Sequence, residues 1–217
     1  MNSGTHAASA TGPAEAEYVD GYLPDDEVLT SARARAEELG CETLSPAAGA
    51  TLGFLAATLC AKAVVEVGTG TGVSGLYLLR GMAADGVLTS IDIEPEYQRA
   101  ARKTFIEAGR PPGRTRLIIG RALDVLSRLT PGGYDLVFVD AARMEYPGYY
   151  EKGVALLRRG GIIAFHNVLA DGRMFDPSRR DAETMGLREV ARAIREDERL
   201  VPALLPVGGG LLVAAAC

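Results

Sequence analysis

The sequence is poor in residues that mark several classes of protein. Its 217 residues include no tryptophan, two histidines and three cysteines. Cys41, Cys60 and Cys217 are odd in number and lack the spacing of a metal or redox motif, so we expect reduced thiols in a cytoplasmic protein. No apolar run is long enough to cross a bilayer. These features argue against a disulfide-rich secreted domain and a membrane protein.

Positive charge is also scarce, with 23 Lys and Arg against 28 Asp and Glu, a net charge of −5. No basic stripe with interleaved aromatics suggests a nucleic-acid partner. The N-terminal stretch has no basic segment followed by an apolar core, so no secretory signal is expected. Its small and polar residues predict a flexible tail over 1–20. Residues 21–217 are expected to form one domain, because this length suits a single core.

Short apolar runs alternate with helical stretches through most of the chain. Strands are predicted at 63–67, 87–92, 116–119, 134–140 and 161–166. Helices are predicted from Asp25 to Gly40, after Ser45-Pro46, near Gly72, Pro95, Ala122 and Pro147, and over 181–197. Near-continuous apolar strands that alternate with helices predict a parallel sheet with helices on both faces.

The C-terminal end breaks this alternation. Two apolar runs, LVPALLP and LLVAAA, are joined by Val207 and the glycines 208–210, with no helix between them. This pattern predicts a hairpin, so the last strand should run antiparallel to its neighbours. The expected fold is α/β, with a mostly parallel seven-stranded sheet, an antiparallel last strand and helices on both faces. That layout is typical of Rossmann-like class I methyltransferases.

A glycine-rich turn follows the first predicted strand, in VVEVGTGTGVSGLYLL (64–79). Gly68, Gly70 and Gly72 let the backbone approach a ligand closely, and the helix that follows offers free N–H groups. Dinucleotide-binding proteins use a similar loop with the spacing G-x-G-x-x-G. Glu66 lies two residues before the turn, where a carboxylate repels a pyrophosphate but pairs with a cationic amino acid. The pattern favours S-adenosylmethionine, and a purely structural glutamate is the alternative.

An acidic residue ends the next predicted strand. The Asp92 carboxylate can accept both hydroxyls of a ribose, although it can also cap the helix after Pro95. Its combination with Glu66 favours the ribose role. The third strand ends at Gly120, and the nearby Ala122 is small enough for an adenine to lie flat. A nicotinamide-dependent oxidoreductase is the alternative class, disfavoured by Glu66 and by the terminal hairpin.

The chain resembles the catechol and caffeoyl-CoA O-methyltransferases (family 3), particularly their actinobacterial members. The resemblance runs from about Leu39 to the end, through EVGTGTGVSGLYLL, SIDIEPEY, GRALDVL, YDLVFVDA and GGIIAFHNVL. It implies S-adenosylmethionine as the cofactor. The cofactor contacts that it implies are Leu44, Glu66, Gly68, Thr69, Gly70, Ser74, Asp92, Ile93, Ala122 and Asp140.

Three polar residues end the fourth and fifth predicted strands, where ligands of open α/β sheets bind. In the resembled family the Asp after strand four and an Asp-Asn pair after strand five hold a divalent cation, usually Mg²⁺. Here Asp140 is matched but the pair is His166-Asn167. In the resembled family a lysine three residues after the strand-four Asp acts as the base. Arg143 occupies that position here, and arginine cannot release a proton near neutral pH. An Asp, His and Asn set suits a transition metal better than Mg²⁺.

Three interpretations of this site stay open. In the first, Asp140, His166 and Asn167 bind a divalent metal. In the second, no metal binds and His166 is the general base, a role that suits imidazole chemistry near neutral pH. In the third, His166 only hydrogen-bonds Asp140, and the protein binds S-adenosylmethionine or its product with little turnover. Arg143 would stabilise an oxyanion in the first two.

The predicted activity is methyl transfer from S-adenosylmethionine to a hydroxyl of a small acceptor, aromatic or catechol-like. Catalysis would depend on holding the sulfonium methyl and the oxygen close and in line. The resemblance also implies a homodimer, with the apolar helix at 46–60 or the N-terminal helix as a candidate interface.

Overall fold

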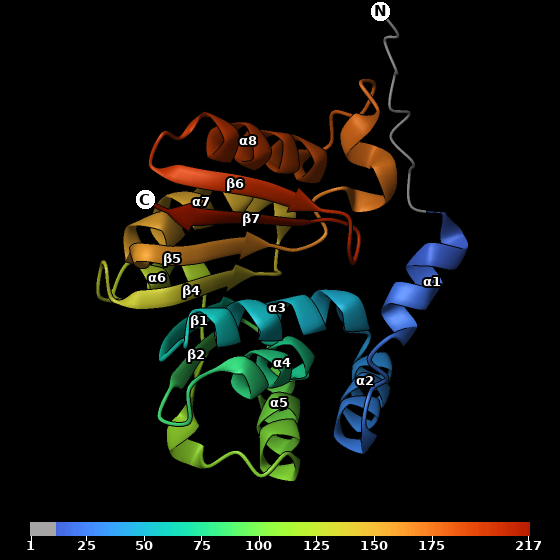
Figure 1. Ribbon diagram of the computed structural model, residues 1–217, viewed down its shortest axis with the longest axis vertical. Coiled ribbons are helices and arrows are strands. Elements are labelled where there is room, and N and C mark those ends of the chain that lie inside the picture. Colours follow the sequence, from blue (N-terminus) through green and yellow to red (C-terminus); the bar gives the residue numbers. More distant parts are fainter. Residues whose placement is uncertain (1–11) are drawn as a thin grey trace, which may run out of the picture.

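The computed structural model describes residues 12–217, which contain a seven-stranded sheet of order β3-β2-β1-β4-β5-β7-β6 (Figure 1). The strands are β1 (Ala63–Val67), β2 (Val87–Asp92), β3 (Thr115–Ile119), β4 (Tyr134–Val139), β5 (Leu157–Phe165), β6 (Leu200–Leu205) and β7 (Leu211–Ala216). Strands β1 to β5 pair in parallel, whereas β7 is antiparallel to β5 and to β6. The predicted fold class and the terminal hairpin are confirmed.

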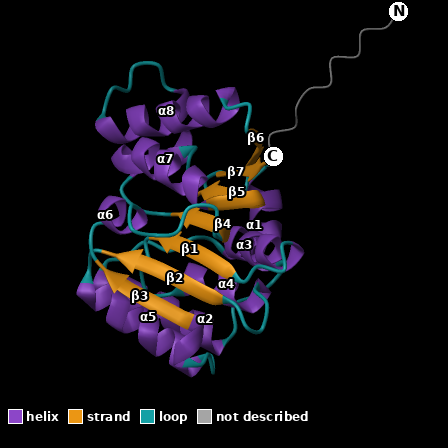
Figure 2. Ribbon diagram, turned by 90° about the vertical axis from the view of Figure 1, so that its left-hand side faces the viewer, coloured by secondary structure: helices purple, strands orange, loops and turns teal. Residues whose placement is uncertain are grey.

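Helices cover both faces of the sheet (Figure 2). The α-helices are α1 (Pro13–Gly21), α2 (Glu27–Leu39), α3 (Pro46–Thr58), α4 (Val73–Gly81), α5 (Pro95–Glu107), α6 (Ala122–Leu126), α7 (Tyr146–Leu156) and α8 (Ala182–Glu196). Three short 3₁₀ turns are η1 (Pro112–Arg114), η2 (Arg143–Glu145) and η3 (Ala170–Phe175). Helices α2 to α5 share one core cluster, and α6 to α8 share the other.

The helix ends follow the local signals in the sequence. The Asp26 carboxylate accepts from Leu29 N at the start of α2, and Gly40 ends that helix in the left-handed conformation. Ser45 accepts from Ala48 N at the start of α3. Side-chain oxygens before a helix satisfy backbone N–H groups that have no partner within it. These caps fix where α2 ends and α3 begins, and the segment between them reaches the cleft described below.

Side chains of β1 alternate between the two cores. Val64 packs with the α2–α5 cluster, whereas Val65 and Val67 pack with the α6–α8 cluster. Successive residues of a strand point to opposite faces, so Glu66 points to the same side as Val64. Its carboxylate therefore enters the space between the sheet and α4.

The terminal hairpin contacts the loop after β5. Val168 N donates to Gly210 O at 3.0 Å, and Leu169 N donates to Gly209 O at 2.9 Å. The glycines are required there, because a Cβ on Gly209 would lie 2.6 Å from Asn167 Oδ1. The hairpin thus holds the loop that carries His166 and Asn167.

Residues 13–20 are helical, whereas the sequence predicts a flexible tail over 1–20. Residues 1–11 lie outside the described residues, but α1 is helical from Pro13, consistent with its Ala- and Glu-rich sequence. Asp20 Oδ1 accepts from Ala47 N at 3.1 Å and connects α1 to α3. None of the helices within residues 12–217 combines the length and the hydropathy that a membrane crossing requires.

Candidate active site

A cleft of about 500 Å³ lies at the carboxyl ends of the parallel strands. Its walls come from the segment before α3, the glycine turn after β1, and the ends of β2, β4 and β5. The predicted site residues that line it are Leu44, Gly68, Thr69, Gly70, Ser74, Asp92, Ile93, Asp140, Arg143, His166 and Asn167. The structure therefore brings together most of the residues that the sequence singled out.

Backbone hydrogen bonds align the strand ends beneath the cleft. Gly68 N donates to Ile91 O at 2.9 Å, and Asp140 N donates to Val67 O at 2.8 Å. His166 N in turn donates to Val139 O at 3.0 Å. Each bond continues the parallel pairing by one residue, so the first residues after β1, β4 and β5 lie side by side.

The turn after β1 needs its glycines. Gly68, Gly70 and Gly72 all have positive φ, at +95°, +50° and +88°. A Cβ on Gly68 would lie 1.9 Å from Asp140 O, a distance that no side chain tolerates. The glycine turn therefore lies directly against the backbone after β4 and joins the two sides of the cleft.

Asp92 is held by backbone donors at the end of β2. Its Oδ2 accepts from Gly70 N at 2.9 Å, and its Oδ1 accepts from Glu94 N at 3.0 Å. These bonds orient the carboxylate, and each oxygen keeps a further lone pair. The geometry is compatible with the predicted acceptance of ribose hydroxyls.

Glu66 does not line the cleft, in contrast to its prediction as a cofactor contact. Its side chain is fully buried, and its oxygens accept from Ser74 Oγ at 2.6 Å and Ser90 Oγ at 2.5 Å. The pKa of Glu66 is raised from 4.5 to about 7, chiefly by burial. The hydrogen bonds from the two serines lower it, and the charges of Asp140 and Asp92 raise it. The alternation of β1 explains the position, because the residue before the last one of this strand faces α4 rather than the sheet edge.

Ala122 also lies away from the cleft. It is the first residue of α6 and is buried in the same core cluster as Ile91. Among the described residues the cleft has no lining side chain from β3 or α6. Ala122, predicted to lie beside the adenine, is therefore part of the core.

Several cleft residues escaped the sequence interpretation. Cys41, Glu42 and Thr43 belong to the segment between α2 and α3, Tyr97 is on α5, and Glu183 is on α8. Arg33 fixes this segment, since its Nη1 donates to Leu44 O at 2.6 Å and Thr43 Oγ1 at 2.9 Å. The helix stop at Gly40 was the only local signal that a loop begins here.

His166 and Asp140 meet at the other end of the cleft. The atoms His166 Nδ1 and Asp140 Oδ1 are 3.1 Å apart, but they lack the angles of a hydrogen bond. Within residues 12–217, both imidazole nitrogens and Asn167 Oδ1 are buried without a hydrogen-bond partner. Buried polar atoms in this condition are rare and point to a missing ligand or ion. The loop itself is held firmly, because Tyr146 OH donates to His166 O at 3.0 Å.

Arg143 lies at the mouth of the cleft between two carboxylates. Its guanidinium nitrogens are 3.6 Å from Glu42 Oε2 and 3.6 Å from Glu183 Oε2. Only 17% of the Arg143 side chain is exposed, whereas Glu42 is 91% exposed. A planar guanidinium at this distance can turn toward an anionic oxygen in the cleft.

The mostly parallel sheet with its reversed last strand, together with the glycine turn, defines a Rossmann-like class I methyltransferase. The family model described as O-methyltransferase matches residues 25–216. A relative from Mycobacterium leprae (strain Br4923), named as an O-methyltransferase, is 55% identical over 197 residues. That alignment covers 91% of this chain and 88% of the relative. The chain therefore belongs to the O-methyltransferase family, as the resemblance predicted.

Two solved structures are similar over nearly the whole chain. The O-methyltransferase from Bacillus cereus in complex with SAH has a TM-score of 0.85 and 26% identity, covering 94% of this chain and 97% of that one. The O-methyltransferase TomG from Streptomyces achromogenes, involved in tomaymycin synthesis and in complex with SAM, has a TM-score of 0.85 and 27% identity. It covers 95% of this chain and 96% of its own.

Proposed function

We propose that the protein binds S-adenosylmethionine in this cleft and transfers its methyl group to a hydroxyl of a small acceptor, aromatic or catechol-like. The observation that carries the proposal is the glycine turn, which donates from Gly70 N to the carboxylate of Asp92 at the end of β2 and lies against the backbone of Asp140 after β4. The SAM and SAH complexes of the two similar structures support the choice of cofactor.

The cofactor end of the cleft offers groups for each part of this ligand. Asp92 would accept from the ribose hydroxyls, and Ile93 beside it would contact the base. The ligand can approach the protein backbone closely at Gly68 and Gly70, because glycine has no side chain. The acceptor would then occupy the end near Asp140 and His166, in line with the methyl group.

The residues of the acceptor end fit a divalent metal. Asp140 Oδ1 and His166 Nδ1 are 3.1 Å apart, close enough for both to hold one ion. Asn167, the next residue, also lines the cleft, and its Oδ1 is buried without a hydrogen-bond partner among the described residues. When bound, a metal would acidify the acceptor hydroxyl. Within residues 12–217 no three His, Cys, Asp or Glu side chains form a metal cluster, so the third ligand here would be an amide.

His166 as a general base is the competing mechanism. Its two nitrogens have no hydrogen-bond partner among the described residues, so the nitrogen that carries no proton could take one from an acceptor hydroxyl that reached it. Arg143 would stabilise the resulting oxyanion in either mechanism, since a guanidinium stays charged. The two mechanisms differ in the role of Asn167, which can bind a metal but cannot accept a proton from the acceptor.

Binding and turnover test the proposal separately. Calorimetry should detect S-adenosylhomocysteine but not NADH, and a panel of phenols and catechols should include a methyl acceptor. Chelation should abolish turnover, and Mn²⁺, Co²⁺ or Zn²⁺ should restore it. Loss of activity in His166→Ala with retention in Asn167→Ala, together with full turnover after chelation, would favour the base mechanism.

The opposite results have distinct meanings. Binding of NADH in place of S-adenosylhomocysteine would contradict the methyltransferase proposal. Nucleoside binding without transfer to any acceptor would favour a binding protein with a degenerate acceptor site.

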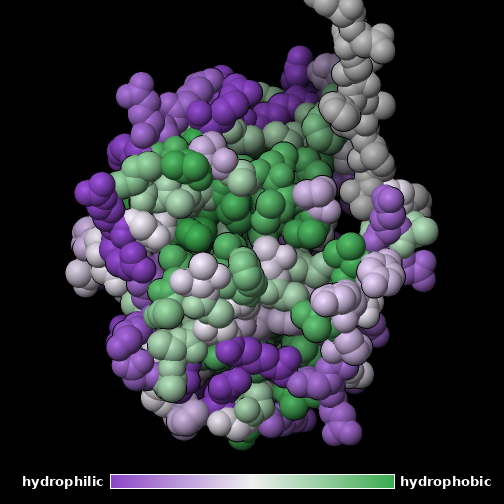
Figure 3. Space-filling view, in the orientation of Figure 1, coloured by the Kyte–Doolittle hydropathy of each residue, from purple (hydrophilic) through white to green (hydrophobic). Residues whose placement is uncertain are grey.

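We also infer a homodimer. Figure 3 shows hydrophobic surface over β6 and β7, on the face of the molecule that carries α3. Val201 and Leu204 of β6 and Phe54 of α3 are all exposed. Exposed apolar patches of this kind mark protein interfaces. Light scattering coupled to gel filtration should give twice the chain mass, and Phe54→Asp with Val201→Asp should reduce it.

A further inference from the structure

The turn between β6 and β7 lies near the start of α3 and against the two residues that follow β5 (Figure 1). Its three glycines, 208–210, have positive φ, at +54°, +72° and +95°. Val168 N and Leu169 N donate to carbonyls of this turn, so its backbone is joined directly to the loop after β5. Because glycine has no side chain, the turn presents only backbone atoms to that loop.

Gly209 packs against the side-chain amide of Asn167. A Cβ on Gly209 would lie 2.6 Å from Asn167 Oδ1 and 3.1 Å from its Cγ, so the backbone of the turn comes close to the amide. Within residues 12–217 this Oδ1 is buried but accepts no hydrogen bond. Packing against Gly209, rather than a hydrogen bond to Oδ1, therefore fixes the direction of the amide.

Gly208 makes the corresponding contact with His166. A Cβ at this position would lie 3.2 Å from His166 Nε2, 2.6 Å from Ala48 Cβ and 3.3 Å from Ser45 Oγ. The imidazole is thus flanked by the turn on its Nε2 side and by Asp140, 3.1 Å away, on its Nδ1 side. Neither nitrogen has a hydrogen-bond partner among the described residues. Packing therefore directs this ring as well, and Nδ1 is the nitrogen that lies beside Asp140.

We propose that Gly208 and Gly209 are positioning residues, which fix the directions of the His166 imidazole and the Asn167 amide at the acceptor end. This inference rests on the proposed function, because it concerns the polar groups that would serve a metal or an acceptor. Side chains at such sites are ordinarily held by hydrogen bonds from surrounding groups. Bonds to these particular atoms would occupy the lone pairs that the ligand needs. Packing against a turn without side chains holds the same groups and leaves those lone pairs free.

A methyl group added at Gly209 tests the contact with the amide. In Gly209→Ala the amide must turn away, because it is the flexible end of a side chain whereas the turn is fixed by backbone hydrogen bonds. NMR of the metal-free protein should show shifted side-chain amide signals of Asn167. Calorimetry should show Mn²⁺ bound about tenfold more weakly, as for a lost supporting group of a metal site. S-adenosylhomocysteine should bind within about twofold of wild type, because the three atoms nearest to the added methyl group all belong to Asn167.

Gly132→Ala is the matched control. Gly132 has a φ of +68°, close to the +72° of Gly209, but nothing lies within 4 Å of an added Cβ. Both variants should melt about 3 °C below wild type, the effect of the backbone conformation alone. Only Gly209→Ala should change the amide signals and the affinity for Mn²⁺. A merely structural role of the turn predicts the same melting shift without either change.

Two further variants complete the test. Gly209→Ala combined with Asn167→Gly should weaken Mn²⁺ no more than Asn167→Gly alone, because both changes act on one amide. If Gly209→Ala does not fold, as a thermal melt would show, this combined variant should fold, since the added methyl group no longer meets the amide. Gly208→Ala should instead shift the imidazole signals of His166, which can be assigned because His6 is the only other histidine.

The results that overturn the positioning role are specific. They are unchanged amide signals or unchanged Mn²⁺ affinity in Gly209→Ala, additive losses in the combined variant, or failure of the combined variant to fold. If wild type binds no Mn²⁺, the metal site of the proposed function is contradicted, and the amide signals alone decide the positioning role. Absence of S-adenosylhomocysteine binding by wild type would contradict the methyltransferase proposal itself.

Discussion

The two ends of the cleft differ in how their polar groups are satisfied. At the cofactor end, both oxygens of Glu66 and both oxygens of Asp92 accept hydrogen bonds from the protein. At the acceptor end, the nitrogens of His166 and Asn167 Oδ1 are buried without partners. Among the described side chains, Arg143 is held by two ion-pair contacts of 3.6 Å. The first end is organised before any ligand arrives, whereas the second leaves donors and acceptors free for a ligand.

Substitutions at the cofactor end should therefore lower stability, whereas substitutions at the acceptor end should lower activity. Removing a partner of a satisfied buried group exposes its desolvation cost, but removing an unpartnered group does not. Gly68 is the point where the two ends meet, because its backbone lies against the carbonyl of Asp140.

Gly68→Ala should have the largest effect. Its Cβ would lie 1.9 Å from Asp140 O at a φ of +95°, so the turn and the strand end must separate. We expect a loss of more than about 4 kcal/mol in unfolding free energy and no measurable binding of S-adenosylhomocysteine. Thermal melts and calorimetry measure both.

Gly109→Ala is the matched control, since Gly109 has a φ of +65° but nothing within 4 Å of an added Cβ. Its cost should be that of the backbone conformation alone, about 1 kcal/mol. Similar losses in the two variants would mean that the close approach at Gly68 does not matter.

Glu66 gives the cofactor end a distinctive pH dependence. Its pKa is raised from 4.5 to about 7 by burial, so the folded state keeps a proton that the unfolded state has lost between these values. Its contribution to stability is therefore present at low pH and falls as pH rises through this window. Between pH 5 and pH 7 the loss should be about 2 kcal/mol relative to Glu66→Gln.

Chemical denaturation of wild type and Glu66→Gln at pH 5, 6, 7 and 8 measures this difference. Carboxylates of lowered pKa, such as Asp26 and Asp135, make stability rise with pH, the opposite of Glu66. Their contribution is the same in both proteins, so it cancels in the comparison. A difference that stays constant with pH would show that Glu66 is ionised throughout.

The sequence predicted the fold and most of the cleft because these depend on local signals. Strands, the helix stop at Gly40, the glycine turn and strand-end acids each have a pattern of neighbouring residues that specifies them. The parallel topology then forces Asp92, Asp140 and His166 to the same edge.

The errors and omissions concern side-chain direction and long-range packing. Glu66 is one residue from a strand end, and only the alternation of β1 decides that it faces α4. Glu183 joins the cleft because α8 packs against η2, closely enough that a Cβ on Gly186 would lie 2.5 Å from Arg143 O. No local pattern contains information on such contacts between distant segments.

Asn167→Gly tests the acceptor end. Asn167 has a φ of +53° and an unpartnered Oδ1, so glycine should keep the backbone and stability within about 1 kcal/mol. If the amide binds a metal, turnover should fall about a hundredfold, in the range of lost metal-site groups. Asn167→Ala, strained by the same φ, should lose stability as well. A stability loss in Asn167→Gly larger than in Asn167→Ala would contradict the view that this amide is free.

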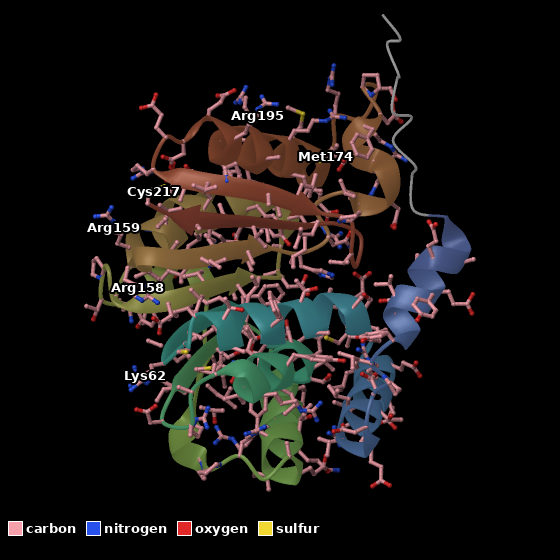
Figure 4. The ribbon with its side chains drawn as sticks, viewed as in Figure 1. Lys62, Arg158, Arg159, Met174, Arg195 and Cys217 are labelled. Atoms are coloured by element: carbon pink, nitrogen blue, oxygen red, sulfur yellow. The ribbon has the colours of Figure 1, made fainter. Side chains whose placement is uncertain are left out.

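Arg143→Met should have the smallest effect on stability. The matched control is Arg158, an arginine at the opposite end of the strands. Figure 4 shows Arg158 and Lys62 on the same side of the molecule, on the left, where β5 begins and just before β1 begins. Arg158 Nε donates to Asp135 Oδ1 at 2.6 Å, and the other oxygen of Asp135 accepts from Lys62 N. Arg158→Met should therefore cost about 1 kcal/mol in unfolding free energy and leave turnover unchanged. Arg143→Met should change stability by less than about 0.5 kcal/mol, because its ion pairs are long and one partner is exposed, yet slow methyl transfer about tenfold. Denaturant melts and initial rates on both variants measure this, and a slower rate in Arg158→Met with an unchanged rate in Arg143→Met would reverse the contrast between the two ends.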